Sequence, residues 1–166
     1  MSYHIYTTKG LILSERPLRE ADRVYSILTR DLGLIRATAL GARKESSKLR
    51  GGLEPVALVS ISLVRGKEYW RTTSVELIHK VKPLQEILRP LALLEKLVQG
   101  EAHHPELFDA LERLVASPNT KAEMFEIGFV AQILHHLGYL KEDDLNLPKK
   151  DLIKAINDGL NSTHLT

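Results

Sequence analysis

Along the first 80 residues, hydrophobic side chains occur in short runs, several of which alternate with a period close to two residues, as is typical of β-strands. Glycine, proline and charged residues interrupt these runs, as they do in turns. The pattern predicts five strands, over residues 3–13, 23–29, 33–40, 55–64 and 69–78. Because no helical pattern long enough for a crossover separates them, we expect a small antiparallel barrel or sandwich.

After residue 80 the period changes to three and four residues, the spacing of one face of an α-helix. The first helical run contains Pro90, so we expect either a kink or two short helices there. Thr120 and Glu123 match the capping box that begins a helix, and this helix continues to about Leu137. It is apolar on nearly every side, which predicts a position at the centre of a bundle. Further helices are predicted over residues 104–115 and 151–160.

The two patterns together predict an α+β fold. A five-stranded barrel domain is expected at residues 1–80, and an all-α helical domain that docks partners at residues 81–166. The chain has 166 residues, of which 43% are hydrophobic, and this is enough to bury a substantial core.

The chain contains no cysteine, which excludes disulfides, thiolate zinc sites and cysteine nucleophiles. No apolar run approaches the roughly 20 residues of a membrane-spanning helix. The N-terminal segment MSYHIYTTKG lacks the apolar region of a secretory signal. We therefore expect a cytoplasmic location and no membrane contact.

The net charge of +2 conceals an asymmetry between the two halves of the chain. Residues 1–80 carry a net charge of +6, and residues 81–166 a net charge of −4. A basic half is a candidate for binding nucleic acid. The alternative is ordinary scatter in surface charge, and the two interpretations remain equally open at this point.

Motifs of common enzymes are missing from the sequence. It contains neither a phosphate-binding glycine loop nor a G-x-S-x-G nucleophile motif. The histidine pairs 103–104 and 135–136 are adjacent residues, which point about 100° apart on a helix, so one pair rarely supplies two ligands to one metal. A site shared between the two pairs would require their helices to pack together. We expect no catalytic residue, no cofactor and no metal.

The connection between the third and fourth predicted strands, GARKESSKLRGG at residues 41–52, is strongly basic. Glycines at both ends allow sharp turns, and its serines supply hydroxyl donors that suit phosphate oxygens. A solvated loop is the ordinary interpretation of such a run. The basic residues of this loop are Arg43, Lys44, Lys48 and Arg50, and those on adjoining elements include Arg30, Arg36, Lys67 and Arg71. A basic groove on a small barrel is typical of sequence-tolerant binding to single strands.

The fifth predicted strand contains the only tryptophan of the chain, Trp70. Simple alternation places Trp70 on a largely polar face, where it could stack on a base. The alternative is that it packs under a loop or against the helical half, as tryptophans are usually well buried. The same alternation places Tyr69, Arg71 and Leu77 on the core side.

Residues 18–55, LREADRVYSILTRDLGLIRATALGARKESSKLRGGLEP, resemble the N-terminal domain of the RecO family of bacterial recombination mediators. The E-A-D element, the L-T-R-x-x-G turn and the G-A-R-K…S-K-L-R-G-G-L-x-P segment carry the resemblance. It implies an OB-fold followed by a helical domain, and a non-enzymatic role. It further implies binding to single- and double-stranded DNA, annealing of complementary strands and assistance to RecA, with a nucleoid-associated location.

The resemblance also implies partners, namely RecR, the C-terminal tail of single-strand-binding protein and, indirectly, the RecA filament. Many family members place a four-cysteine zinc motif after an L-G-Y element, which is present here at residues 137–139. In this chain the segment KEDDLNLPKK follows instead. We therefore expect a short form of the family that binds no zinc.

We expect DNA to cross the barrel face that carries the basic loop, flanked by Arg36, Lys67 and Arg71, with Arg30 and Trp70 also in contact. Charge reversal at Arg43 and Lys44 should then weaken DNA binding. The competing hypothesis is a protein-interaction adaptor of the repair machinery, whose barrel docks proteins rather than DNA. A lack of DNA affinity at low salt would favour that hypothesis.

Overall fold

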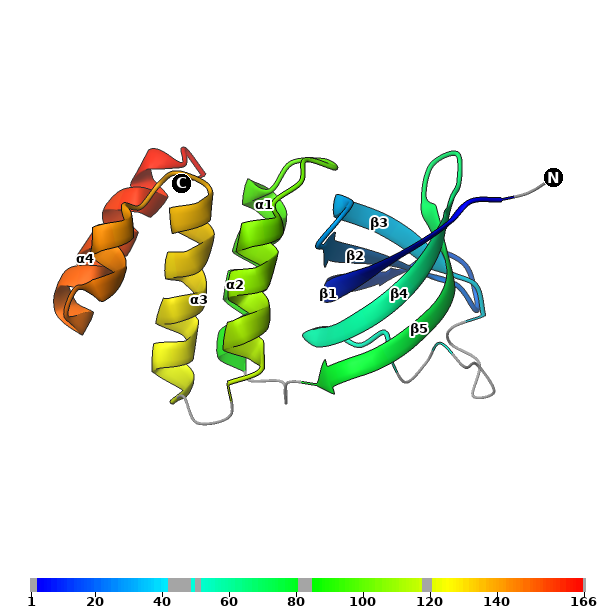
Figure 1. Cartoon of the computed structure of the whole chain (residues 1–166), viewed down its shortest axis with the longest axis horizontal. Helices are drawn as coiled ribbons and strands as arrows, with labels where there is room; N and C mark the ends of the chain where they lie inside the picture. The colour runs from blue at the N-terminus through cyan, green and yellow to red at the C-terminus, as the bar shows by residue number, and fades with distance from the viewer. Residues whose placement is uncertain (1–2, 42–48, 50–51, 81–84, 118–120, 166) are drawn as a thin grey trace.

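Figure 1 presents the computed structural model, in which a strongly curved sheet at one end of the molecule is followed by a layered stack of helices. The structure describes residues 3–41, 49, 52–80, 85–117 and 121–165. The four basic residues of the 41–52 loop, Arg43, Lys44, Lys48 and Arg50, lie outside the described residues.

The sheet contains the five predicted strands and closes into a barrel in the order β1-β2-β3-β5-β4. All neighbouring strands are antiparallel except β3 and β5, which pair in parallel over a short stretch. This closed five-stranded barrel confirms the predicted OB-fold. The strands are β1 (Ile5–Pro17), β2 (Arg23–Thr29), β3 (Gly33–Ala39), β4 (Ala57–Arg65) and β5 (Trp70–Lys80).

A β-bulge in β5 reverses the alternation predicted for the start of this strand. Ser62 of β4 pairs with Ser74, whereas the next residue, Leu63, pairs with Thr72, so Thr73 is an extra residue. A bulge of this kind shifts the side chains before it to the opposite face of the sheet. Trp70 is therefore buried, in agreement with the alternative interpretation, and Arg71 is exposed, the reverse of what simple alternation predicts for both residues.

The helical part contains four α-helices and one 3₁₀-helix among the described residues. Pro90 lies inside a single helix, so of the two predicted alternatives, a kink or two short helices, the second was wrong. The N-cap of the third helix is Lys121, and Thr120 of the predicted capping box lies outside the described residues. No helix in the described ranges is long and apolar enough to cross a membrane. The helices are α1 (Gln85–Leu97), α2 (Pro105–Val115), α3 (Ala122–His136), η1 (Glu142–Asn146) and α4 (Lys149–Ser162).

Helix α3 lies at the centre of the helical part, between the layer of α1 and α2 and the layer of α4 (Figure 1). Its residues Phe129 and Ile133 are buried against α1 and α2, and Leu134 is buried in a second cluster with Leu152 and Ile156 of α4. A helix covered on opposite sides needs apolar residues all round. The prediction that this helix is central is thereby confirmed.

Barrel and helices share one hydrophobic core. Leu11, Leu28 and Leu58 of the barrel belong to the same buried cluster as Leu94 and Phe108 of the helices, and we refer to this cluster as the shared core. The neighbouring residues Ile12, Ile27 and Val59 point instead into the barrel interior. These strands are thus buried on both faces. The division into separate domains at residue 80 stays a prediction.

Charged contacts surround the shared core. Lys9 Nζ lies 2.8 Å from Glu112 Oε1, and Arg65 Nη2 lies 2.8 Å from Glu101 Oε2. Glu95 of α1 accepts hydrogen bonds from the hydroxyl groups of Ser14 and Ser26, at 3.0 and 2.6 Å. Each contact joins a barrel residue to a helical residue. Some basic residues of the first half of the chain are therefore paired with acidic residues of the second half.

Gly33 allows the loop between α1 and α2 to approach the barrel. Its φ is +74°, and a Cβ atom there would lie 2.6 Å from the carbonyl oxygen of Ala102. Gly100 has a similar φ of +63°, but a Cβ atom there would meet nothing within 4 Å. We expect Gly33→Ala to lower the free energy of unfolding by about 1–3 kcal/mol more than Gly100→Ala, the usual cost of overpacking. Urea denaturation of both variants measures this difference, and equal losses would contradict the close contact.

Candidate nucleic-acid interface

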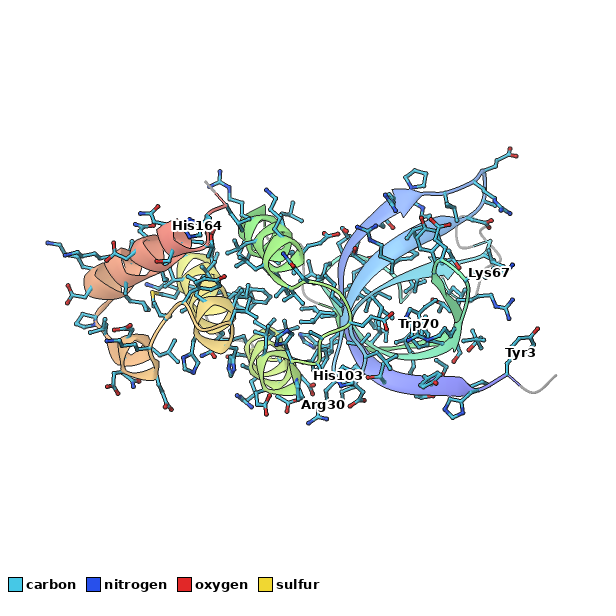
Figure 2. All side chains as sticks on the ribbon, turned by 90° about the horizontal axis from the view of Figure 1, so that it is seen from above. Tyr3, Arg30, Lys67, Trp70, His103 and His164 are labelled. Atoms are coloured by element: carbon cyan, nitrogen blue, oxygen red, sulfur yellow. The ribbon has the colours of Figure 1, made fainter. Side chains whose placement is uncertain are left out.

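The candidate interface is a groove of about 430 Å³ at one end of the barrel. It lies between the loop that joins β1 to β2 and the hairpin that joins β4 to β5. OB-folds bind oligonucleotides at the loops in these two positions. Figure 2 shows Tyr3 and Lys67 at the end of the barrel that lies away from the helices. The residues that line the groove are Tyr3, Leu18, Arg19, Asp22, Thr38, Leu40, Val64, Arg65, Gly66, Glu68, Tyr69 and Arg71.

Asp22 holds one wall of the groove in place. Its carboxylate accepts a hydrogen bond from the backbone N–H of Gly41 at 2.8 Å, and its backbone carbonyl accepts one from the N–H of Leu18 at 3.1 Å. Gly41 has a φ of +67°, which glycine adopts without strain. These contacts tie the β1–β2 loop to the point where the basic 41–52 loop begins.

Aromatic and cationic side chains meet in the groove. Tyr3 is 62% exposed, and the guanidinium of Arg71 lies 6.0 Å from the centre of its ring. The hydroxyl of Tyr69 accepts a hydrogen bond of 3.4 Å from Arg16. Arg19 adds a further exposed guanidinium. Arginines can neutralise phosphates, and exposed aromatic rings can stack on bases, so this set is chemically suited to a nucleic-acid strand.

Trp70 does not offer a stacking surface. It is only 4% exposed and packs among barrel residues, with the ring of Tyr6 against it at 5.2 Å. Its indole N–H donates a hydrogen bond of 2.9 Å to Glu101, in the loop between α1 and α2. The interpretation as a base-stacking platform was therefore wrong, because the bulge at Thr73 turns the indole into the barrel.

Arg30 lies at the interface with α2 rather than in the groove (Figure 2). Its guanidinium forms two hydrogen bonds with the carboxylate of Asp109, at 2.9 and 3.1 Å. The hydrogen bond from Arg30 holds the pKa of Asp109 below its ordinary value, although partial burial opposes this effect. The same hydrogen bond raises the pKa of Arg30. Its charge is engaged within the chain.

The other predicted contact residues occupy different positions. Arg71 lines the groove, and Lys67 is exposed on the adjoining β4–β5 hairpin. Arg36 is exposed elsewhere on the barrel, beside a small cavity that it shares with Ser26 and Glu95. The structure thus places Arg71 in the groove and Lys67 beside it, whereas Arg30 and Arg36 lie away from it.

Several residues that line the groove were not predicted from the sequence. Tyr3, Arg19 and Tyr69 are distant from the basic loop in the sequence and come together only through the closure of the barrel. A usable signal was the segment RGKEY at residues 65–69, a charged turn between two strands with a tyrosine at its end. In a five-stranded barrel this turn occupies a position that is used for ligand binding.

The described residues contain no group of three or more histidine, cysteine, aspartate or glutamate side chains that could hold a metal ion. The rings of His135 and His136 lie against each other, and Nδ1 of His135 is 3.2 Å from the carbonyl oxygen of Leu140. Burial, with the neighbouring His135, lowers the pKa of His136. These histidines are accounted for by local packing.

Comparison with known proteins identifies similar chains. The family model described as "Recombination protein O N terminal" matches residues 1–81. A "DNA repair protein RecO" of Gloeobacter violaceus is 32% identical over 146 residues, which are 81% of this chain and 56% of that protein. The protein of the same name from Dehalococcoides mccartyi strain ATCC BAA-2100 is 34% identical over 141 residues, 77% of this chain and 56% of that protein.

A third relative, "DNA repair protein RecO" of Synechococcus sp. strain JA-2-3B'a(2-13), is 42% identical over 81 residues, 49% of this chain and 28% of that protein. The similarity is thus higher over the shorter match than over the matches that extend into the helices. Even in the longer matches, the chain spans little more than half the length of the relatives.

Proposed function

The chain belongs to the RecO family of DNA repair proteins, and on that premise we propose that it is a non-enzymatic DNA-binding protein of recombinational repair. The observation that carries the proposal is the groove between the β1–β2 loop and the β4–β5 hairpin, where arginines, the exposed Tyr3 and the half-buried Tyr69 line the ligand-binding position of an OB-fold. The basic 41–52 loop begins at the wall of this groove.

The proposed mechanism is electrostatic. Arg19 and Arg71 in the groove, Lys67 beside it and the cations of the 41–52 loop neutralise phosphates and release the counterions condensed on the strand. Tyr3 supplies an exposed ring for stacking on a base. When both strands of a pair are neutralised their mutual repulsion falls, so complementary strands anneal without any covalent step. The same surface accepts single- and double-stranded DNA because it contacts the backbone.

The composition of the groove supports a binding role rather than a catalytic one. Its two carboxylates belong to Asp22 and Glu68, and that of Asp22 is already bonded to the backbone of Gly41. The described lining residues include no histidine that could serve as a base and no carboxylate pair arranged around a common point.

Partners follow from the family resemblance. We propose that the helical part docks RecR and the acidic tail of single-strand-binding protein, and that the chain assists RecA onto DNA that is coated by single-strand-binding protein. The net charge of −4 on residues 81–166 makes the helices a poor surface for DNA. This favours a division of labour in which the barrel holds DNA and the helices hold proteins, with the acidic tail bound at a local basic site, for which Lys96 and Arg113 are exposed candidates, rather than by the net charge.

The test is a fluorescence anisotropy titration of a labelled single-stranded oligonucleotide at several salt concentrations. Each phosphate contact contributes about 0.7 to the slope of log affinity against log salt, so a few contacts predict a slope of about −2 to −5. An oligonucleotide of uncharged backbone serves as control and should bind much more weakly. Absence of binding at about 50 mM salt would overturn the proposal and favour the protein-interaction adaptor.

A further inference from the structure

Three side chains form a compact cluster where the groove approaches the helices. Nη2 of Arg65 lies 2.8 Å from Oε2 of Glu101, and its guanidinium carbon lies 4.3 Å from the centre of the Trp70 ring. The other carboxylate oxygen of Glu101 accepts the indole hydrogen bond of Trp70 at 2.9 Å. Arg65 is therefore stacked on one partner and paired with another, and both partners also bind each other.

Glu101 reaches this position from the helical part of the chain. It belongs to the connection between α1 and α2, which runs along the barrel close to Gly33. Because Gly33 has no side chain, the backbone of Glu101 and Ala102 approaches the barrel more closely than any other residue type would permit. Figure 2 shows Trp70 inside the barrel and His103, on the same connection, at the boundary with the helices.

The carboxylate of Glu101 is held in its charged form. Partial burial opposes ionisation, but the hydrogen bonds from Trp70 and Arg65 outweigh it and lower the pKa below the ordinary value. At neutral pH a full negative charge thus faces the guanidinium of Arg65.

Arg65 belongs both to the cluster with Trp70 and Glu101 and to the lining of the groove. It lines the groove together with Arg19 and Arg71, and its side chain remains 61% exposed. A phosphate in the groove would therefore find this guanidinium within reach, but with its charge already balanced by Glu101. Because an arginine that is paired with a carboxylate contributes little net attraction to a second anion, the two anions compete for it.

We propose that Glu101 sets how strongly the groove holds a phosphate backbone, by competing with the phosphate for Arg65. This inference rests on the proposed function and adds a residue of the helical part to the control of DNA binding. Arg65 is the contact residue, and Glu101 acts through it.

The competition between Glu101 and a DNA phosphate for Arg65 acts in both directions. A ligand that draws Glu101 away from the barrel strengthens DNA binding, and DNA that engages Arg65 weakens the contact between barrel and helical loop by the same factor. A protein docked near residues 98–104 can therefore change the affinity of the groove without touching it. The cluster of Arg65, Trp70 and Glu101 therefore couples the DNA-binding groove of the barrel to the protein-docking surface of the helical part.

The test is a double-mutant cycle in the full chain, measured by anisotropy with a single-stranded oligonucleotide. Glu101→Gln removes the charge and preserves the size of the side chain. We expect binding about fivefold tighter near 0.1 M salt and a salt slope steeper by about 0.7, the signature of one additional phosphate contact. Arg65→Gln alone should change affinity by no more than about twofold, and the double variant should bind like Arg65→Gln alone.

Glu68→Gln is the matched control, because Glu68 also lines the groove and, within the described part of the chain, forms no ion pair with Arg65. Glu68→Gln should raise the affinity for DNA only because it removes one negative charge from the groove, and this gain should persist when Arg65 is replaced. A gain from Glu101→Gln that likewise persists in the Arg65→Gln background would overturn the inference and leave the proposed function intact. Absence of binding by the unmodified chain would instead overturn the proposed function.

The unmodified chain offers an independent measurement. Trp70 is its only tryptophan, and Arg65 and Glu101 are both in contact with it. If a phosphate displaces Arg65, the fluorescence of Trp70 should change with the same midpoint as the anisotropy and return when salt releases the oligonucleotide. Binding without any change in Trp70 fluorescence would count against displacement.

Discussion

Replacement of Phe108 by alanine should lower the free energy of unfolding by about 3–5 kcal/mol, the usual range for a large aromatic core residue. Phe108 is 1% exposed and lies in the shared core, where helix α2 faces the barrel. The cavity would open between barrel and helices and could not be filled by solvent without breaking the apolar contact. For a chain of this size the melting temperature should fall by roughly 6–20 °C.

Two probes should report this loss together. Trp70 fluorescence follows the barrel and far-ultraviolet circular dichroism follows mainly the helices, and a shared core predicts coincident urea transitions for both. Met124→Ala, at an exposed position of α3, is the control and should change stability by about 0.5 kcal/mol or less. A helical transition that shifts while the barrel transition stays in place would contradict a common core.

Charge reversal of Arg19 and Arg71 to glutamate should weaken binding of a single-stranded oligonucleotide by roughly tenfold to a hundredfold at 0.1 M salt, because two phosphate contacts are lost and repulsion is added. The salt slope should become shallower by about 1.4. Both residues are exposed in the groove, so the fold should remain unchanged. Anisotropy measures the affinity, and circular dichroism checks the fold.

Two further double variants locate the contact. Arg43→Glu with Lys44→Glu tests the basic loop, which was proposed from sequence alone and lies outside the described residues. Lys150→Glu with Lys154→Glu changes the charge equally on α4, far from the barrel, and should leave affinity nearly unchanged (Figure 1). If the α4 variant loses as much affinity as the Arg19 and Arg71 variant, binding depends on total charge rather than on the groove.

The periodicity of the sequence predicted the strands well because each strand has an interior face with a regular spacing. Residues 23–29 form β2 as predicted, and the other predicted strands differ from the observed ones mainly at their ends. The continuous apolar run Leu11–Leu13 also has a clear physical meaning in the structure. Ile12 points into the barrel, while its two neighbours enter the shared core, so no polar face is left in this part of the strand.

The site was harder to predict than the fold. A single extra residue, Thr73, inverted the expected orientation of Trp70 and Arg71, and nothing in the local sequence marks a bulge at that position. The groove also gathers residues from the N-terminal segment, two turns and three strand ends, which only the closed barrel brings together. Alternation along one strand carries no information about such a set.

The net charge of the first half of the chain indicated its basic character, but the sequence did not show which of its cations remain available to a ligand. The basic character of the first half was visible in the sequence, yet Arg30 is bonded to Asp109 and Lys9 to Glu112. Which cations remain available to a ligand depends on contacts between residues about 80 to 100 positions apart. No short motif reports such pairs.

The shared core also limits how the barrel can be recombined with other domains during evolution. Leu11, Leu28 and Leu58 present their side chains to helices encoded later in the same chain. A rearrangement that joined the barrel to an unrelated partner would leave these leucines facing water, or would require new side chains of matching shape. Selection therefore acts on the barrel and its helices as one heritable unit, and a change on either side of their contact favours a compensating change on the other.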